Sequence, residues 1–347
     1  MSKISPEIFE TALAFFLEPV GELMADESVR EIMINGIGQI FVEQNGTLRK
    51  TDAAFSDPDQ LMAAVKNIAQ YVGVYVRPDT SRFDARLPQG HRVHVVLPPV
   101  CRQGISVTIR KHTKSAFGLA DLVRIGSINE ESKGFLGLAM ARGKNMIISG
   151  GTGTGKTTFI NALSALIPSD ERIITIEDAA ELQIEQEHVI SLEARAPDRK
   201  GFGGVTIRDL LHSSLRMRPD RIVVGECRGG EALDLLQAMN TGHGGSMSTV
   251  HSNSPVESLR RLETLALFSG EDIPLRFLRA QVASAIEVVV QLQRLKGRRT
   301  VQSIAEVLPL NAEGDFEVNE IFTYDYNSEG LVRVGEAKFE SDPASHH

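Results

Sequence analysis

Residues 150–157 read GGTGTGKT and match the pattern G-x-x-x-x-G-K-[ST] at every fixed position. They follow the apolar run 146–149 and precede a helical pattern, which is the context in which this motif binds phosphates. The glycines let backbone N–H groups turn toward phosphate oxygens, and the N-terminus of the following helix adds partial positive charge. The segment therefore predicts a nucleotide-binding P-loop. No N-K-x-D motif that reads guanine is present, which favours ATP over GTP.

Two side chains of this loop have their own predicted roles. The ammonium of Lys156 is expected to reach the β- and γ-phosphates, and the hydroxyl of Thr157 is expected to ligate Mg²⁺. ATP and Mg²⁺ are therefore the predicted ligands. The residues expected to bind them are Gly151, Thr152, Gly153, Thr154, Gly155, Lys156, Thr157 and Thr158.

Hydrolysis also requires carboxylates, and these follow two apolar runs. Glu226 comes after residues 222–224, while Glu177 and Asp178 come after residues 173–176. In an open parallel sheet the carboxyl ends of the strands meet at the edge where the ligand binds. A single carboxylate at a strand end is a solvated or capping group about as often as it is part of a site. The position of all three carboxylates at strand ends is what favours a site here. Glu226 is predicted to bind Mg²⁺ directly or through its water shell.

The elements that must position these residues fall into two parts. Over residues 1–112, helical patterns accompany strand patterns at 83–87, 92–97 and 105–110, which predicts a small α+β domain. Residues 113–125 lack a clear period and are predicted to be a linker. From residue 126 to 347, short β-branched runs alternate with helical patterns, which predicts an α/β domain with a mainly parallel sheet.

The composition narrows the possible classes of protein. Of the 347 residues, 42% are hydrophobic, and the formal charge of −8 weakens any hypothesis of nucleic-acid binding. Cys101 and Cys227 lie far apart and form no metal-binding motif, which indicates a reducing compartment. The sequence has no apolar run of 18 residues and no basic leader, so we expect neither a membrane span nor export.

Two longer segments carry a family resemblance. Residues 215–230 (LRMRPDRIVVGECRGG) and 238–251 (AMNTGHGGSMSTVH) closely resemble the secretion-superfamily ATPases, which power type II and type IV secretion, type IV and Tad pili, and conjugation. The chain looks most like the CpaF/Tad pilus-assembly branch. Residues 29–35, 41–43 and 84–110 extend the resemblance to the amino-terminal part. The resemblance therefore covers nearly the whole chain, and it implies a RecA-like ATPase domain with a PAS-like amino-terminal domain.

The resemblance also implies roles for individual residues. Residues 175–178 match the Asp box of the family, whose first glutamate positions the attacking water, which assigns this role to Glu177. Glu226 matches the atypical Walker B acid. Residues 241–251 match the His box, in which the second histidine, His251, senses the nucleotide. Without the resemblance, a histidine at a strand end would more often be a structural residue.

Two arginines of the amino-terminal domain receive a role in the same way. In the resembling family, arginines near the positions of Arg92 and Arg110 reach the γ-phosphate across a mobile cleft between domains. Guanidinium groups suit bidentate contact with phosphate and could distinguish ATP from ADP. On their own, arginines in strand patterns would usually face water.

The function implied is that of a cytoplasmic motor. The resemblance implies a homohexameric ring at the cytoplasmic face of the inner membrane, which hydrolyses ATP and drives a platform protein of a pilus or secretion machine. A chain with only two cysteines cannot form the tetracysteine metal module that type II and pilus-extension ATPases often have. This difference argues against those two branches.

Three alternatives remain open at this point. The first is a conjugative type IV secretion ATPase, which differs in cargo rather than chemistry. The second, from another class, is an assembly scaffold that binds ATP with little turnover. The third is a nucleic-acid translocase using the basic loop with Arg195, Arg199 and Lys200. The acidic chain as a whole favours an ordinary surface loop there, so nucleic acid is a disfavoured partner.

Overall fold

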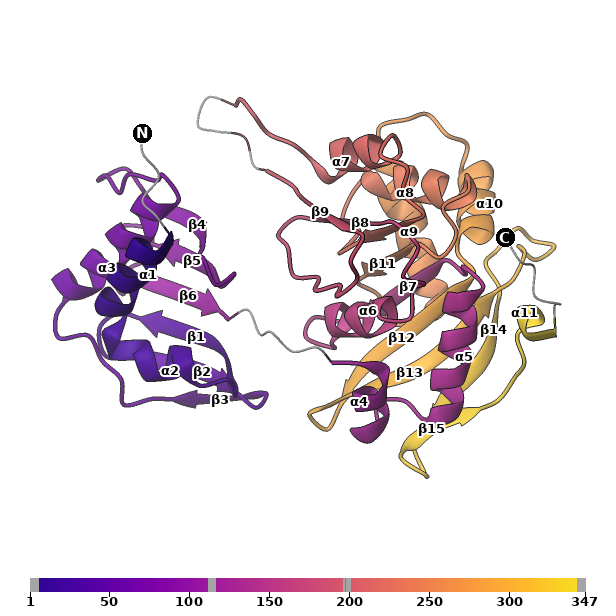
Figure 1. Ribbon diagram of the computed structural model, residues 1–347, viewed down its shortest axis with the longest axis horizontal. Helices are drawn as coiled ribbons and strands as arrows, with labels where there is room; N and C mark the ends of the chain where they lie inside the picture. The colour runs from indigo at the N-terminus through magenta and orange to yellow at the C-terminus, as the bar shows by residue number, and fades with distance from the viewer. Residues whose placement is uncertain (1–5, 112–116, 196, 198–200, 342–347) are drawn as a thin grey trace. The chain divides into compact units, whose positions relative to one another are not determined.

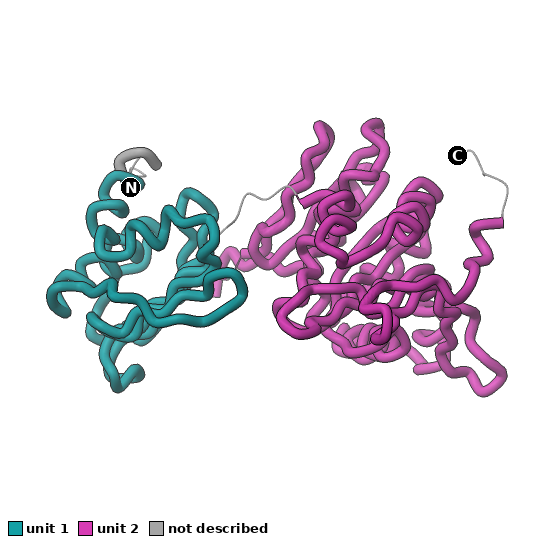
Figure 2. The backbone as a smooth tube through the Cα atoms, turned by 90° about the horizontal axis from the view of Figure 1, so that it is seen from below, with its two compact units in different colours: residues 1–115 teal, residues 116–347 magenta. Residues whose placement is uncertain are grey.

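The computed structural model describes residues 6–111, 117–195, 197 and 201–341. The chain divides into two compact units, Met1–Ser115 and Ala116–His347, which Figure 2 shows in different colours. Below, unit 1 denotes the amino-terminal part and unit 2 the carboxy-terminal part.

Unit 1 is an antiparallel sheet with helices on one face (Figure 1). The six strands have the order β3-β2-β1-β6-β5-β4. Its helices are α1 (Pro6–Phe16), the 3₁₀ turn η1 (Glu18–Val20), α2 (Gly21–Ala25) and α3 (Pro58–Tyr71). Its strands are β1 (Val29–Asn35), β2 (Ile40–Gln44), β3 (Thr47–Lys50), β4 (Arg82–Arg86), β5 (Arg92–Val96) and β6 (Ser106–Arg110). The three strands predicted within residues 83–110 are thereby confirmed.

Alternation along the strands separates an apolar face from a polar one. In β5, Val93 and Val95 are buried in the core, whereas His94 between them is exposed. Helices α1 and α3 cover the apolar face, and the rings of Phe9 and Tyr71 stack with centroids 4.0 Å apart. The polar face of the sheet is thus left to carry charged side chains.

Unit 2 is a nine-stranded sheet between two layers of helices. Its strand order is β15-β14-β13-β12-β7-β11-β10-β8-β9. The strands from β12 to β9 in this order pair in parallel, and β13, β14 and β15 are antiparallel additions. The helices are α4 (Leu119–Arg124), α5 (Glu130–Ala141), α6 (Lys156–Ser164), α7 (Ile207–Ser214), α8 (Glu231–Asn240), α9 (Pro255–Leu267), α10 (Leu275–Ala285) and α11 (Lys338–Ser341). The strands are β7 (Met146–Gly150), β8 (Ile173–Glu177), β9 (Val189–Glu193), β10 (Arg221–Val224), β11 (Met247–Val250), β12 (Val288–Leu295), β13 (Arg298–Val307), β14 (Val318–Asp325) and β15 (Gly330–Arg333).

Buried residues on both faces explain why the central strands read as continuous apolar runs. In β7, Met146 and Ile148 pack into a core with α4, α5 and α6, whereas Ile147 packs into a second core with α7 to α10. The predicted α/β class with a mainly parallel sheet is confirmed. A sheet of this kind gathers its carboxyl strand ends at one edge.

The predicted linker differs from the observed structure. Residues 119–124 form helix α4, in which Leu119 and Leu122 are buried in the core of unit 2. The carboxylate of Asp121 accepts a hydrogen bond of 3.1 Å from the backbone N–H of Gly118 and so caps the helix start. A helix of six residues shows too few apolar positions to display a period, which is why the sequence indicated a linker up to residue 125. Residues 113–116 lie outside the described ranges.

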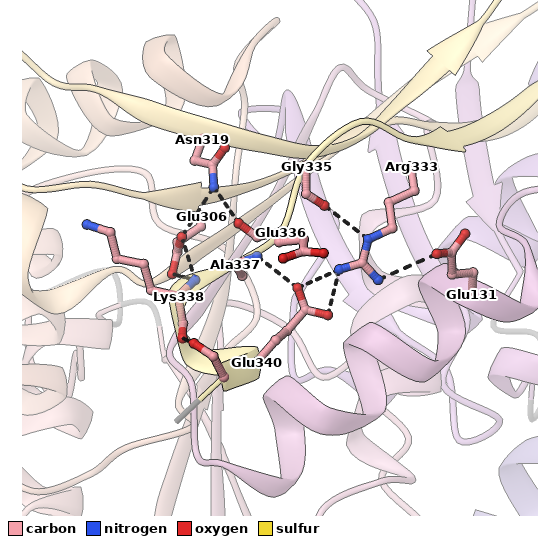
Figure 3. A network of polar contacts seen from close by, with 10 residues as sticks. Glu131, Glu306, Asn319, Arg333, Gly335, Glu336, Ala337, Lys338 and Glu340 are labelled. Atoms are coloured by element: carbon pink, nitrogen blue, oxygen red, sulfur yellow. Dashed lines mark hydrogen bonds and ion pairs between the residues drawn. The ribbon is translucent and has the colours of Figure 1, made fainter. Parts of the chain in front are cut away.

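The carboxy-terminal helix α11 is held on unit 2 by charged side chains, which Figure 3 shows, and by an aromatic contact. Arg333 on β15 donates to both carboxylate oxygens of Glu340 at 2.7 Å. Phe339 is buried with its ring centroid 5.3 Å from that of Phe135 on α5. This contact closes the core beside the antiparallel strands. Within the described ranges, no helix has the length and apolar character needed to cross a membrane.

Candidate active site

The P-loop (residues 150–158) joins the buried end of β7 to α6, the arrangement expected from the sequence. A Cβ atom on Gly150 would lie 2.7 Å from Thr154 Oγ1 and 2.8 Å from the Leu292 carbonyl oxygen, so no side chain fits there. Gly153 and Gly155 have φ angles of 73° and 98°, in the left-handed region that favours glycine. Gly150 is therefore required for space, and glycine is strongly favoured at 153 and 155 for the backbone conformation.

Lys156 turns back over the loop that precedes it. Its Nζ donates to the carbonyl oxygens of Gly150 at 2.9 Å and Gly151 at 3.1 Å, and it lies 3.4 Å from Nδ1 of His251. Burial lowers the pKa of Lys156; the charge of Glu226 opposes this shift and the charge of Arg228 adds to it. An ammonium has three N–H donors, and three acceptors surround this one.

His251 connects the lysine to an acid on the neighbouring strand end. Its Nε2 lies 3.0 Å from Oε1 of Glu226, and the other oxygen of Glu226 accepts from Arg228 at 2.9 Å. Because Lys156 can only donate, Nδ1 of the histidine must accept, and the ring proton then sits on Nε2, where it is donated to Glu226. Lys156, His251, Glu226 and Arg228 thus form one hydrogen-bonded chain.

The electrostatics of this chain favour a neutral histidine beside an ionised glutamate. Burial lowers the pKa of His251, and the charge of Lys156 lowers it further, against the opposing effect of Glu226. Burial raises the pKa of Glu226, but the hydrogen bond and charge of Arg228, with the nearby His251 and Lys156, outweigh it and leave the pKa lowered. The contact between His251 and Glu226 is therefore a hydrogen bond from a neutral ring at neutral pH rather than an ion pair.

Glu177 lies at the buried end of β8, and only 4% of it is exposed. Its Oε1 accepts hydrogen bonds from the backbone N–H groups of Glu181 at 2.7 Å and Leu182 at 2.9 Å. Asp178, the next residue, lies 4.0 Å from the guanidinium of Arg228. The carboxylate of Glu177 is thus oriented by the backbone of the loop that follows it.

The sheet order brings these residues together although they are far apart in sequence. Strands β7, β11, β10 and β8 are neighbours in that order. The P-loop, His251, Glu226 and Glu177 stand at or directly after their four carboxyl ends. The residues of unit 2 that were predicted to bind or hydrolyse a nucleotide therefore share one edge of the sheet.

Two residues of this edge were not predicted from the sequence. Arg228 is paired with Glu226 and stands two residues after it in the sequence. An opposite charge so close to a predicted acid was the signal that the sequence offered. Gly225 precedes Glu226, and a Cβ atom there would lie 2.9 Å from Cγ of Glu177. No sequence pattern reveals such a contact between two strands.

The contact of Gly225 with Glu177 leads to a prediction. Gly225→Ala is expected to lower kcat about 10- to 100-fold, because the new methyl group must displace the carboxylate that the loop orients. Steady-state phosphate release measures the effect. Gly137→Ala on α5 is the matched control, because a Cβ atom there meets nothing within 4 Å. An unchanged kcat for Gly225→Ala would mean that the position of Glu177 does not matter for turnover.

Arg92 and Arg110 belong to unit 1. On the sheet, Arg86 pairs with Arg92, and Arg92 pairs with Arg110, so three arginines stand in one row across β4, β5 and β6. Residues opposite each other in adjacent antiparallel strands share a face.

Of the basic loop considered for nucleic acid, Arg199 and Lys200 lie outside the described residues.

The fold and the residues at this edge define the chain as an ATPase of the P-loop class. Residues 16–330 match the family model described as type II/IV secretion system protein, and the chain belongs to this family.

Curated relatives agree with this assignment. A Mycobacterium tuberculosis protein (strain ATCC 25618 / H37Rv) named for conjugal transfer is 35% identical over 299 residues, which cover 84% of each chain. The type IV secretion system protein PtlH of Bordetella pertussis is 32% identical over 86% of this chain and 95% of its own. VirB11 of Bartonella quintana, also a type IV secretion system protein, is 33% identical over 83% and 91%.

Solved structures share the fold. The ATPase DotB of Legionella pneumophila aligns with a TM-score of 0.61 at 23% identity, over 86% of this chain and 82% of that one. The pilus retraction motor PilT with bound ADP aligns with a TM-score of 0.60 at 19% identity, over 87% and 84%. These similarities extend across both units of the chain.

Proposed function

We propose that this protein is the motor ATPase of a type IV secretion or pilus machine, and that it works as a homohexameric ring in which ATP hydrolysis drives movement of unit 1 relative to unit 2. The observation that carries the proposal is the chain Lys156–His251–Glu226, which ties the P-loop to an acid on another strand end. A site connected in this way responds to the nucleotide as well as binding it.

The response follows from the donors of Lys156. All three N–H groups of its ammonium have acceptors nearby, so a phosphate oxygen must replace at least one of them. The contact with His251 is the longest of the three, at 3.4 Å, and is the first that a phosphate oxygen is expected to replace. Nucleotide binding would then release His251 and alter its hydrogen bond to Glu226. This sequence of exchanges gives His251 the role of a nucleotide sensor.

The residues of the site suit Mg²⁺ as the accompanying ion. Thr157 and Glu226 would hold it, the glutamate directly or through water, and its lowered pKa keeps it ionised for this purpose. Bound there, Mg²⁺ would neutralise charge on the phosphates. Across the described parts of the chain, no group of three or more His, Cys, Asp or Glu side chains is placed to hold a metal. A magnesium ion that shares its ligands with phosphates and water needs no such group.

Glu177 is assigned to the attacking water. Two backbone amides hold one oxygen of its carboxylate, so its orientation is set before substrate binds. Lys156 stabilises the charge that develops on the transferred phosphoryl group, and Glu177 aligns the nucleophile. With these two roles the site performs hydrolysis rather than binding alone.

The arginine row of unit 1 is assigned to the γ-phosphate. Arg86, Arg92 and Arg110 stand in one row across β4, β5 and β6, and Glu31 of β1 stands opposite Arg110 at the end of this row. Guanidinium groups gathered on one face suit bidentate contact with phosphate oxygens. Arg92 and Arg110 would then make the closure of unit 1 depend on ATP.

This assignment is tested by comparing ATP with ADP. Arg92→Met is expected to weaken binding of a non-hydrolysable ATP analogue about tenfold and to leave ADP binding unchanged, because only ATP has the γ-phosphate. Arg82→Met is the control, since Arg82 lies on the same sheet but pairs with Val96. Isothermal titration measures both ligands, and mass photometry measures ring formation. Equal losses for ATP and ADP, or no loss, would contradict the assignment of the row to the γ-phosphate.

The proposed partners are further copies of this chain and a platform protein at the cytoplasmic face of the inner membrane. The relative named for conjugal transfer supports DNA as a second candidate cargo, beside the pilins of a Tad system. Deleting the gene separates the two, since loss of pili indicates the first and loss of DNA transfer with intact pili the second. A purified ring that binds ATP but releases no phosphate would instead indicate a nucleotide-gated scaffold.

A further inference from the structure

The hairpin of β12 and β13 extends beyond the edge of the parallel sheet. The pairing of β12 with β7 ends at Leu292 opposite Gly150, whereas its pairing with β13 continues to Leu295 opposite Arg298. Lys296 and Gly297 form the turn, with φ angles of 48° and 83° that are typical of a tight two-residue hairpin. The hairpin tip, defined as residues 293–300, therefore projects past the point at which the P-loop begins.

Two glycines of the P-loop lie against this hairpin. A Cβ atom on Gly150 would lie 2.8 Å from the carbonyl oxygen of Leu292 and 3.2 Å from its Cβ. The second glycine is Gly155, where a Cβ atom would lie 3.4 Å from Cδ of Arg299. The half-buried stem of Arg299 thus packs against the residue that directly precedes Lys156. The hairpin forms one wall of the P-loop.

The tip is strongly basic in an otherwise acidic chain. Its eight residues include Arg294, Lys296, Arg298 and Arg299 and no acid. Arg294 stands directly opposite Arg299 in the antiparallel pair, so both side chains leave the same face of the hairpin. This is the face of Leu292, two residues before Arg294, which meets the P-loop. Two like charges are therefore placed side by side next to the phosphate-binding residues.

The remainder of the tip is held by the turn between β14 and β15. Lys296 Nζ lies 2.9 Å from a carboxylate oxygen of Glu329, and the hydroxyl of Tyr326 lies 3.4 Å from Oε1 of Gln293. Gln293 and Arg294 are adjacent on the strand and so point to opposite faces. These contacts brace the hairpin on the side away from the P-loop.

We propose that Arg299, with Arg294 beside it, is a further nucleotide-binding residue, whose guanidinium binds phosphate oxygens of a nucleoside di- or triphosphate held by the P-loop. This inference rests on the proposed function and deepens it. Both side chains leave the hairpin on the face that meets the P-loop, so their charge is on the side of the phosphate-binding residues. The planar guanidinium offers paired donors to phosphate, and the stem remains packed on Gly155.

The test removes each charge and keeps the stem. Arg299→Met and Arg294→Met are each expected to weaken ADP and ATP-analogue binding about tenfold, with a smaller effect on adenosine. The matched control is Lys296→Met, which removes the same charge from the same hairpin and should leave both affinities within about twofold, since its partner is Glu329. Arg299→Lys keeps the charge without the paired donors, and an intermediate affinity is expected.

Thermal unfolding without nucleotide separates binding from folding. The midpoint is expected to stay close to that of the unchanged protein in Arg299→Met, because the methionine keeps an apolar stem packed on Gly155. A lower midpoint with unchanged affinities would overturn the inference and make Arg299 a structural residue. Equal losses for Lys296→Met and Arg299→Met would also overturn it, because net charge alone would explain them.

Lys156→Ala distinguishes failure of this inference from failure of the proposed function. If Lys156→Ala loses nucleotide affinity while Arg299→Met and Arg294→Met keep it, the inference is wrong and the P-loop assignment stands. If Lys156→Ala binds nucleotide normally, the P-loop assignment itself fails, and the inference fails with it.

Discussion

Lys156→Ala is expected to lower the rate of ATP hydrolysis by at least about 10³-fold. The ammonium of Lys156 is the buried cation of the P-loop, and it is tied through His251 to Glu226. Steady-state phosphate release measures the loss. Lys133→Ala is the matched control, because Lys133 is paired with Glu130 on the surface of α5.

The same variant has a second expected effect, on His251. The charge of Lys156 helps to hold the pKa of His251 below its ordinary value, so the pKa should rise when that charge is removed. Because its pKa is lowered, the His251 ring is neutral at neutral pH in the unchanged protein. In the variant, the ring becomes protonated at a higher pH. NMR titration of the His251 ring measures the shift. A lower pKa in the variant, or turnover equal to that of the control, would contradict the role of Lys156.

Glu177→Gln is expected to lower kcat by about 10²- to 10⁴-fold and to leave nucleotide affinity within a few-fold. The amide side chain has nearly the same shape and keeps an oxygen that can accept from the backbone N–H groups of Glu181 and Leu182. The change therefore removes the carboxylate while preserving its setting. Single-turnover phosphate release, with affinity measured separately, separates chemistry from binding.

The control for this experiment is an exposed carboxylate on the same loop. Glu187→Gln makes the same chemical change at an exposed position and should leave kcat unchanged. If Glu177→Gln weakens nucleotide binding as much as it lowers kcat, Glu177 supports the fold of the site rather than the attacking water. A stable complex of the variant with unhydrolysed ATP is the result that fits the assignment.

Some features of the site could be predicted from the sequence because their causes are local. The P-loop is a property of consecutive residues, since the glycines at 150, 153 and 155 allow positive φ angles that other residues rarely adopt. Glu177 and Glu226 were predicted in the same way, because each stands just after an apolar run long enough to indicate a strand. The two-part organisation also followed from a local change in pattern.

Other features were not predictable because they depend on few or distant residues. Helix α4 presents only Leu119 and Leu122 to the core, too few to show a helical period. Gly225 has no side chain to signal its role, and its importance depends on the neighbouring strand that carries Glu177. Arg294 and Arg299 are close in sequence, but only the strand register places them opposite each other and on the face that meets the P-loop.

The sequence by itself determined the chemistry that this protein can perform, because motifs of a few consecutive residues specify phosphate binding and place acids at strand ends. The tertiary structure alone decided which of these groups act on one another. The order β7-β11-β10-β8 differs from the order along the chain, and it places Lys156, His251 and Glu226 within hydrogen-bonding reach across three strands. Sheet order depends on long-range packing between two helical layers, and no short segment of the sequence contains that information.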